Sequence, residues 1–237
     1  MVLLFDADSL VFSSCYKKRE NPEDSPYYDN LEDITGKFDE VFMKIINDLE
    51  ETYQIDEVKV FNGSLGNFRK LITPKYKANR INTPKPPLLN EVHQWVKENY
   101  NSIWGHGIET DDLVAKYWFE LSKDIGRDNV MIVSIDKDYK QLPCILYNYH
   151  YQHQTISNIS YKESLYNFYS QMIIGDSADN VNYCKGYGKA YAKRLFQDCE
   201  TNYQFTKKTY ELYKEIYKSK GKQKYIQCYN LLKLRTE

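Results

Sequence analysis

The chain lacks several features that mark whole classes of protein. Among its 237 residues, no apolar run approaches the roughly 18 residues that a membrane-spanning helix needs. The apolar start, Met1–Phe5, has no basic segment before it and is interrupted at once by Asp6 and Asp8, so no secretory signal peptide is predicted. Internal repeats and low-complexity segments are also missing. We therefore expect a soluble, cytoplasmic protein with one large domain, or one domain and a small appendage, and no membrane partner.

Cysteine is scarce, and its spacing excludes two further kinds of site. The five cysteines are odd in number and include no CxxC pair; they are Cys15, Cys144, Cys184, Cys199 and Cys228. This pattern fits reduced thiols better than a disulfide framework or a zinc site. His150 and His153 form an HxxH pattern without further ligands in a clear arrangement, so zinc is not expected there either.

Net charge is nearly absent, but its distribution is uneven. The 32 basic and 33 acidic residues give a net charge of −1. Residues 1–62 are rich in acids, whereas residues 63–90 contain Lys and Arg but no acid, and residues 185–235 are mainly basic. Two separate basic stretches favour a polyanionic ligand, although a solvated lysine-rich surface is an alternative. The 23 tyrosines suit either stacking on bases or packing in a core.

Apolar runs and helical periodicities alternate along the chain. Short apolar runs predict strands at residues 2–6, 58–61, 102–104, 130–135 and 144–148. Helical spacing predicts helices at residues 9–16, 34–52, 88–100, 110–122 and 162–174, two short helices within 181–197, and a tail over 203–234 broken near 219–221. Asn62-Gly63 is expected to turn the chain after the second strand. This alternation predicts an α/β fold with a mostly parallel sheet flanked by helices.

Acidic residues form four clusters, each where a β-strand is expected to end. The clusters are Asp6; Glu109, Asp111 and Asp112; Asp136 and Asp138; and Asp176 and Asp179. In an open α/β sheet the carboxyl ends of the strands meet at one rim, so these eight side chains are expected to converge. A helix dipole or a surface turn explains any one cluster alone. Crowded carboxylates need cations, so the conjunction predicts a magnesium site for two ions.

Two basic motifs accompany the acids. Lys77 and Arg80 are spaced to share one face if their segment is helical, and they suit contact with a phosphodiester beside the metals. In KGYGKAYAKRLF a Gly-x-Gly turn opens a helix, where backbone N–H groups and Lys189, Lys193 and Arg194 can hold phosphate. Solvated surface charge explains the first motif equally simply, and a glycine packing corner the second.

The order and spacing of these motifs resemble the 5′-nuclease (flap endonuclease) superfamily. The pattern is closest to phage 5′→3′ exonucleases and to the 5′-nuclease domain of bacterial DNA polymerase I. The resemblance covers about residues 1–200 and depends on FDAD, FRKLITPKYKANR, GIETDD, VSIDKDYKQLP and IIGDSADNVNYCKGYGKAYAKRLF. It implies a PIN-like catalytic domain over residues 1–175, then a helix–three-turn–helix DNA-binding region and a basic helical tail over residues 176–237.

The resemblance also implies roles for individual residues. The eight acids would arrange two Mg²⁺ ions, for which Mn²⁺ can substitute, and Asp112 and Asp136 are expected to be catalytic. Lys77 and Arg80 would steer the scissile phosphate. A K⁺ ion is implied at the Gly186–Gly188 turn. The implied DNA contacts are Arg69, Lys70, Tyr76, Lys77, Arg80, Lys185, Gly186, Gly188, Lys189, Lys193 and Arg194.

Two positions depart from the pattern of that superfamily. The second strand usually ends in Asp, but here it offers Asn62, whose amide oxygen can coordinate magnesium without contributing charge. The segment between Arg80 and Leu88 is short and rich in proline, so a helical arch over the active site is expected to be reduced or absent. Asn62 is retained in the expected metal site.

The leading hypothesis is a magnesium-dependent 5′→3′ exonuclease or flap endonuclease that acts in replication, recombination or repair. Its partners would be DNA with 5′ ends, nicks or flaps, RNA–DNA primers and replication proteins, in the host cytoplasm if a phage encodes it. One alternative is a catalytically impaired protein of the same fold that binds branched DNA, an idea supported by Asn62 alone. The other is a PIN-type ribonuclease for single-stranded RNA, which the Gly-x-Gly element disfavours.

Overall fold

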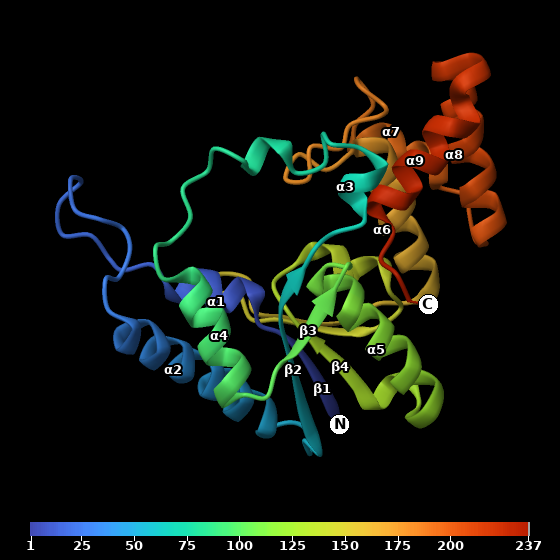
Figure 1. Cartoon of the computed structure of the whole chain (residues 1–237). Coiled ribbons are helices and arrows are strands. Elements are labelled where there is room, and N and C mark those ends of the chain that lie inside the picture. The colour runs from blue at the N-terminus through green and yellow to red at the C-terminus, as the bar shows by residue number, and fades with distance from the viewer. Residues whose placement is uncertain (237) are drawn as a thin grey trace.

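Six strands form one sheet in the computed structural model, which describes residues 1–236 (Figure 1). The strand order is β3-β2-β1-β4-β5-β6. The strands are β1 (Val2–Asp6), β2 (Glu57–Leu65), β3 (Ile103–His106), β4 (Val130–Val133), β5 (Ile145–Asn148) and β6 (Thr155–Asn158). All neighbouring strands pair in parallel except β5 and β6, which are antiparallel. The predicted mostly parallel α/β sheet is therefore confirmed.

Helices cover both faces of this sheet and continue beyond it. The α-helices are α1 (Asp8–Ser14), α2 (Leu31–Glu50), α3 (Arg69–Ile72), α4 (Leu89–Asn99), α5 (Thr110–Ile125), α6 (Tyr161–Ile174), α7 (Lys189–Phe196), α8 (Asn202–Tyr217) and α9 (Gly221–Leu232). Figure 1 shows α1, α2 and α4 on one side of the sheet and α5 on the other. Among the described residues, no helix is long and apolar enough to cross a membrane.

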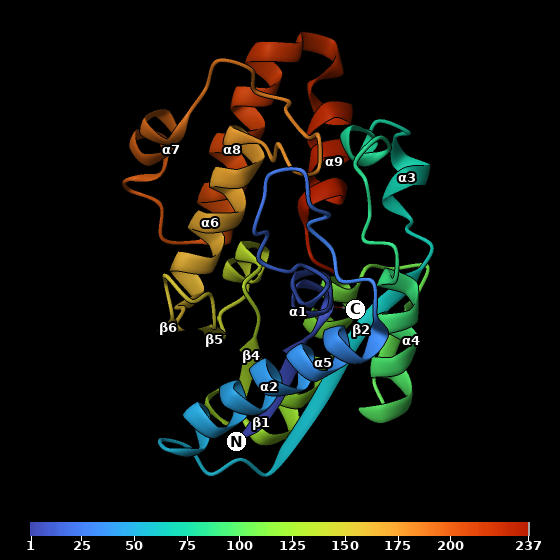
Figure 2. The same cartoon turned by 90° about the vertical axis from the view of Figure 1, so that its left-hand side faces the viewer.

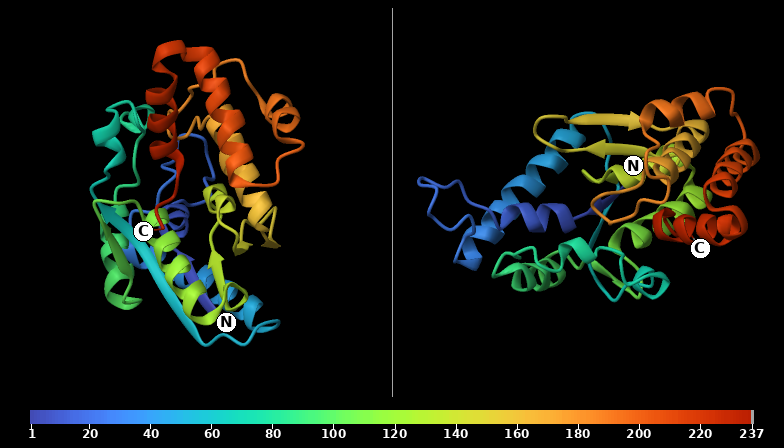
Figure 3. Two further views of the ribbon diagram at one scale, coloured as in Figure 1. Left: turned by 90° about the vertical axis from the view of Figure 1, so that its right-hand side faces the viewer. Right: turned by 90° about the horizontal axis from the view of Figure 1, so that it is seen from above.

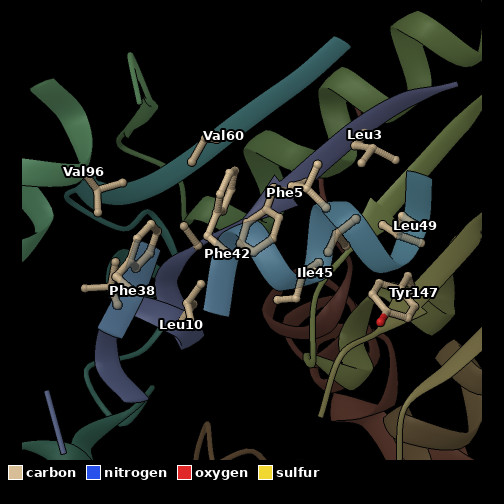
Figure 4. Close-up of a cluster of buried hydrophobic side chains, with 14 of the residues drawn as sticks. Leu3, Phe5, Leu10, Phe38, Phe42, Ile45, Leu49, Val60, Val96 and Tyr147 are labelled. Carbon is tan, nitrogen blue, oxygen red and sulfur yellow. The ribbon is translucent and has the colours of Figure 1, made fainter. Parts of the chain in front are cut away.

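Alternation along β1 places apolar side chains on both faces. Leu3 and Phe5 belong to a cluster with residues of α2 such as Phe38 and Phe42 (Figure 4). Val2 and Leu4 pack on the opposite face, in the cluster that contains Trp118 of α5. Successive strand residues point to opposite faces, so a strand covered on both sides is apolar throughout. This two-sided burial fixes the position of the carboxyl end of β1, where Asp6 lies.

The helices α6–α9 share a third core that is separate from the sheet. It contains Phe168, Tyr169 and Met172 of α6 together with Phe205 and Tyr213 of α8. Figure 3 shows these helices grouped beyond one end of the sheet. The segment after α9 then returns to the sheet, where Leu234 joins the core beneath α5. Helix α6 lies before residue 175 but packs in this third core. The division of the chain into domains at 1–175 and 176–237 stays a prediction.

Several local predictions were wrong in their details. Asn62 and Gly63 lie inside β2 instead of forming a turn after it. Of the two short helices predicted within residues 181–197, the structure forms only α7, because residues 181–188 make turns. The polar sequence of β6 gives no apolar signal, and that strand was not predicted. Between α3 and α4, the described helical structure is limited to the three-residue 3₁₀ helix η1 (Ala78–Arg80).

Candidate active site

A cleft lies at the carboxyl ends of β1 and β4. It has a volume of about 420 Å³ and is completed by the start of α5 and by the loop after α6. Eight carboxyl groups line it: Asp6, Asp8, Glu109, Asp111, Asp136, Asp138, Asp176 and Asp179. Only three cationic side chains do so: Lys77, Arg80 and Lys137. Segments distant in sequence therefore meet as the acidic pattern predicted, and acids exceed bases.

Asp6 is buried at the carboxyl end of β1. Its Oδ2 accepts hydrogen bonds from the Tyr139 hydroxyl at 2.8 Å and from Ser134 Oγ at 3.3 Å. Burial and the neighbouring Asp8 carboxylate raise the pKa of Asp6 to about 7. The side chain is thus held in one orientation while its charged form remains costly.

Asp136 and Asp138 form the β4 side of the cleft. Asp136 caps the 3₁₀ helix η3 (Lys137–Gln141), and its Oδ1 accepts the Asp138 N–H at 2.8 Å. Gln171 Nε2 donates to Asp138 Oδ1 at 2.8 Å and to Asp176 Oδ2 at 3.0 Å, which joins this side to the loop after α6. Burial and the Asp136 charge raise the pKa of Asp138 to about 7, and burial also raises that of Asp136.

The cationic side chains in the cleft lie against the acids. Lys77 pairs with Glu109 and, at 3.6 Å, with Asp179, while Arg80 Nη2 lies 3.0 Å from Asp179 Oδ1. Although burial opposes it, the ion pair with Lys77 holds the pKa of Glu109 below its usual value. Lys137 lies 2.7 Å from Asp176. Lys77 and Arg80 therefore lie in the cleft, where their present partners are carboxylates.

Tyr76 was expected on the DNA-binding surface, but the structure places it in the interior. It is buried, and its hydroxyl donates toward Glu109 Oε2 and Asp179 Oδ2, each at 2.7 Å. Burial and these two negative charges raise the pKa of Tyr76. One hydroxyl thus connects the start of α5 to the loop after α6. The residue positions acids and is not accessible to a strand of DNA.

Asp112 was expected among the metal ligands and catalytic residues, but it does not line the cleft. It is fully buried and accepts from Arg69 Nη2 at 2.8 Å and from the Arg235 N–H at 2.9 Å. Arg69, expected to contact DNA, is likewise buried and also donates to the carbonyls of Leu231 and Lys233. The bidentate Arg69–Asp112 pair joins α3 to α5, and the further bonds to Leu231, Lys233 and Arg235 join both helices to the C-terminal segment, so the pair is structural in this arrangement.

Asn62 also points away from the cleft. Its Nδ2 donates to the His93 carbonyl at 2.8 Å, and its Oδ1 contacts His93 Nδ1, so both ends of the buried amide are used. The expected contribution of its amide oxygen to a metal is therefore not supported. Asp8 lies in the cleft instead, with its Oδ1 accepting the Gly63 N–H at 2.6 Å. The sequence signal for Asp8 is the FDAD motif, in which two acids alternate, although only Asp6 of this motif was predicted to bind metal.

The basic residues around α7 lie on the surface. Lys185, Lys189, Lys193 and Arg194 are all exposed, and we call them the basic α7 surface. Within residues 1–236, none of the four is in an ion pair. Gly186 has φ +92°, a conformation that favours glycine, and it turns the chain ahead of the α7 N-terminus. Lys70, the remaining predicted DNA contact, is exposed on α3.

The donor set of the cleft fits divalent cations by its chemistry. All eight acidic donors are carboxylates, the hard oxygen ligands that Mg²⁺ and Mn²⁺ prefer. Burial and the Asp112 charge raise the pKa of Asp111 well above its usual value, as expected where acids outnumber bases. In the part of the chain that the structure describes, no three His, Cys, Asp or Glu side chains converge tightly enough to hold an ion as they stand. Binding would therefore require side chains such as Lys77 and Lys137 to release their acids.

Comparison with known proteins gives a family match that covers most of the chain. Residues 1–166 match the family model described as 5′-3′ exonuclease, N-terminal resolvase-like domain. The chain is 25% identical over 218 residues to DNA polymerase I of Borreliella burgdorferi, covering 84% of this chain and 22% of that protein. It is 27% identical over 188 residues to a 5′-3′ exonuclease of Buchnera aphidicola, covering 73% and 63%. It thus spans less than two thirds of either relative.

Solved structures share the fold. The chain matches a bacteriophage T5 D15 flap endonuclease in complex with DNA and metal ions, with a TM-score of 0.67, 15% identity, and coverage of 100% of this chain and 90% of that one. It matches a T5 5′-exonuclease with bound zinc at a TM-score of 0.59 and 13% identity, covering 98% and 100%. At these identities the likeness establishes the architecture alone.

Proposed function

Since the chain belongs to the family of the 5′-3′ exonuclease N-terminal, resolvase-like domain, we propose that it is a divalent-metal-dependent nuclease. It hydrolyses phosphodiesters of DNA, including 5′ flaps, and of RNA primers at or near 5′ ends, in replication, recombination or repair. The observation that carries this proposal is the cleft in which eight carboxyl groups face three cationic side chains. Such an excess of buried acid suits a site completed by divalent cations.

The acids that would hold Mg²⁺ are those lining the cleft. They comprise the predicted Asp6, Glu109, Asp111, Asp136, Asp138, Asp176 and Asp179, with Asp8 added and Asp112 and Asn62 left out. Two bound ions would supply a water activated for attack and charge to stabilise the leaving oxygen. Gln171, Tyr139 and Tyr76 orient these carboxylates through the hydrogen bonds described above. These hydrogen bonds restrict the carboxylates individually, while release of the ion pairs with Lys77 and Lys137 would bring them together around the cations.

Lys77 and Arg80 bind and orient the phosphodiester in this proposal. Both already lie beside Asp179, so they are within the cleft that would receive a phosphate. When the carboxylates engage cations, these two side chains become available to the phosphate oxygens. They then offset the negative charge that develops there during hydrolysis.

The basic α7 surface binds the DNA backbone and positions the 5′ end over the cleft. Its four cations are free of ion pairs among the described residues, so they are available to phosphates. We further propose K⁺ at the Gly186–Gly188 turn, Mn²⁺ as a substitute for Mg²⁺, and a cytoplasmic site of action with replication proteins. Binding of this kind weakens with salt and is largely indifferent to sequence.

The test is cleavage of end-labelled DNA in Mg²⁺ or Mn²⁺, with and without a chelator. The substrates are a nicked duplex, a 5′ flap and an RNA-primed duplex. Metal-dependent release of 5′ nucleotides or flaps supports the proposal and shows which structure is preferred. Cleavage that continues in chelator, or that generates only internal cuts remote from 5′ ends, contradicts it.

One observation favours a second candidate function. Residue 62 of β2 is an asparagine whose amide is turned to His93, and β2 contributes no carboxylate to the cleft. The protein would then be a catalytically impaired member of the family that binds branched DNA. Tight binding of flaps and nicks without cleavage in either metal would support this candidate over the nuclease.

A further inference from the structure

The acidic cleft continues into a groove along α6. Past Lys137 and Asp138, which line both spaces, a hollow of about 380 Å³ lies between η3, α6 and the start of α7. It shares Lys140, Tyr166 and Asn167 with a third hollow of about 760 Å³ between β6, α6 and the end of α7. Figure 2 shows α7 beside α6, with β5 and β6 near the lower end of α6. We call the two hollows together the α6 groove.

The charged side chains of the α6 groove that form no ion pair are positive, whereas the cleft has an excess of negative side chains. Lys140, Lys189 and Lys193 line it, are exposed, and form no ion pair with any residue that the structure describes. The groove also contains two acids, but both are engaged. Asp138 accepts from Gln171, and Glu163 caps α6 by accepting the Ser160 N–H at 2.8 Å. The unpaired side chains of the groove therefore attract a polyanion.

An aromatic ring lies where the two hollows meet. Tyr166 lines both and is half-buried, with its ring held edge-on by Phe196 at a centroid distance of 6.3 Å. Beside it, Asn167 Nδ2 donates to the Lys140 carbonyl at 2.9 Å, which fixes the wall that carries Lys140 to α6. A basic groove with an aromatic side chain is typical of surfaces that bind single-stranded nucleic acid.

We propose that the α6 groove binds an unpaired segment of a nucleic-acid strand that continues from the acidic cleft. Lys140 and Lys193 bind its phosphates, and Tyr166 stacks on a base. An unpaired strand suits the groove better than a duplex, because paired bases have their faces stacked on one another and cannot meet Tyr166. This inference rests on the proposed nuclease function, since that function supplies the strand. It adds Lys140 and Tyr166 to the residues that contact the substrate.

The experiment measures binding by fluorescence anisotropy in chelator, where no cleavage interferes. The probes are single-stranded oligonucleotides of increasing length and a blunt duplex. The Lys140→Ala/Lys193→Ala variant should bind long single strands about tenfold more weakly, and its log–log salt slope should be smaller by about 1.4, or about 0.7 for each lost phosphate contact. Its affinity for the shortest strands should change less than twofold. Its affinity for the duplex should fall less than its affinity for long single strands, because only Lys193 of the two lysines belongs to the basic α7 surface. Lys44→Ala, on the remote α2, should match the parent throughout.

Tyr166 provides a second measurement. Tyr166→Leu should weaken the binding of long single strands several-fold without changing the slope of log affinity against log salt. Tyr166→Phe should retain binding because its ring still stacks. The proposal is overturned if the double lysine variant binds long single strands as tightly as the parent. It is also overturned if Lys44→Ala loses as much affinity for them, or if the double variant loses affinity for the duplex by the same factor. If the parent fails to cleave but the length-dependent loss appears, the groove stands and the nuclease proposal fails. If it cleaves and no loss appears, the groove alone fails.

Discussion

The acidic cleft and the basic α7 surface carry opposite charges and hold them in different ways. In the cleft, Asp6, Asp176 and Asp179 are buried and fixed by hydrogen bonds from neighbouring side chains. On the basic α7 surface, the lysines and the arginine extend into solvent. Burial makes the charges of the cleft strong but costly, whereas exposure makes those of the surface inexpensive and screened by salt. Removing one residue should therefore have a large, local effect in the cleft and a small, additive effect on the surface.

The largest difference is expected for the acids of the cleft. Asp136→Ala should reduce the cleavage rate by roughly two orders of magnitude or more, as loss of one preorganised electrostatic contact commonly does. The rate on an end-labelled flap in Mg²⁺ measures this, and calorimetry should show weaker metal binding. Asp124→Ala removes an exposed acid from α5 and serves as the control. Unchanged cleavage by Asp136→Ala would place the chemistry elsewhere.

The next largest effect is expected on stability, from the buried ion pair between Arg69 and Asp112 behind the cleft. Arg69→Met should lower the free energy of unfolding by about 3–5 kcal/mol, because it leaves the Asp112 carboxylate buried without its partner. Urea denaturation measures this change. Arg69→Met/Asp112→Leu removes both charges and should recover much of the loss, while Lys70→Met, on the exposed side of α3, should change stability little. A loss no greater than that of Lys70→Met would show that the pair is not structural.

Metal affinity should distinguish Asp8, which lies in the cleft, from Asn62, which points away from it. Asp8→Asn keeps an oxygen that can accept the Gly63 N–H but removes the charge, so Mn²⁺ and Mg²⁺ affinity should fall about tenfold. Isothermal titration calorimetry measures the affinity directly. Asn62→Ala is the matched comparison from β2 and should alter metal affinity less than twofold, because its amide faces His93. The reverse ranking of the two variants would restore Asn62 to the metal site.

Burial in the cleft should also make stability depend on pH. The pKa of Asp6 is near 7 in the folded protein and near 4 when exposed, so the native state binds more protons between those values. In chelator, stability should consequently fall as the pH rises from about 4 to 7. The side chain introduced by Asp6→Asn cannot titrate, so the stability of this variant should fall less over the same pH range. Urea unfolding of both proteins at several pH values measures the difference, and parallel curves would contradict the assignment.

The smallest effect is expected on the basic α7 surface. Lys185→Ala should weaken duplex binding several-fold and reduce the slope of log affinity against log salt by about 0.9. Anisotropy titrations in chelator at several salt concentrations give this slope. Lys44→Ala on α2 should leave both quantities unchanged. A loss of affinity with an unchanged slope would mean that Lys185 does not contact a phosphate.

The sequence was sufficient where the relevant pattern is local. Buried strands such as residues 2–6 and 130–133 show as continuous apolar runs, and an acid directly after such a strand must lie at its carboxyl end. Asp6, Asp136 and Asp138 lie in the cleft for this reason. Glu109 and Asp111 reach it from the start of α5, and Asp176 and Asp179 from the loop after α6, where a strand end had been expected. The helix spacing of residues 34–52 likewise anticipated α2, which begins three residues earlier because Asn30 caps it.

Side-chain direction and distant partners could not be read in the same way. Asp112 follows Asp111 directly, yet on a helix the two point in different directions, and only Asp111 faces the cleft. The carbonyl partners of Arg69 lie more than 160 residues away along the chain. Tyr76 has a basic neighbourhood in sequence, but its hydroxyl is turned inward to two acids. These positions depend on tertiary packing that no short pattern encodes.

The contacts after α9 have a consequence for the timing of synthesis. Arg69 donates to the carbonyls of Leu231 and Lys233. The Gln141 side chain donates to the Leu232 carbonyl and accepts from the Leu234 N–H. A nascent chain that has emerged only as far as α8 carries every acid of the cleft but none of these braces. Contacts of such large sequence separation form late in folding. The growing polypeptide should therefore remain incompletely assembled around the cleft until the ribosome has delivered residues 231–235.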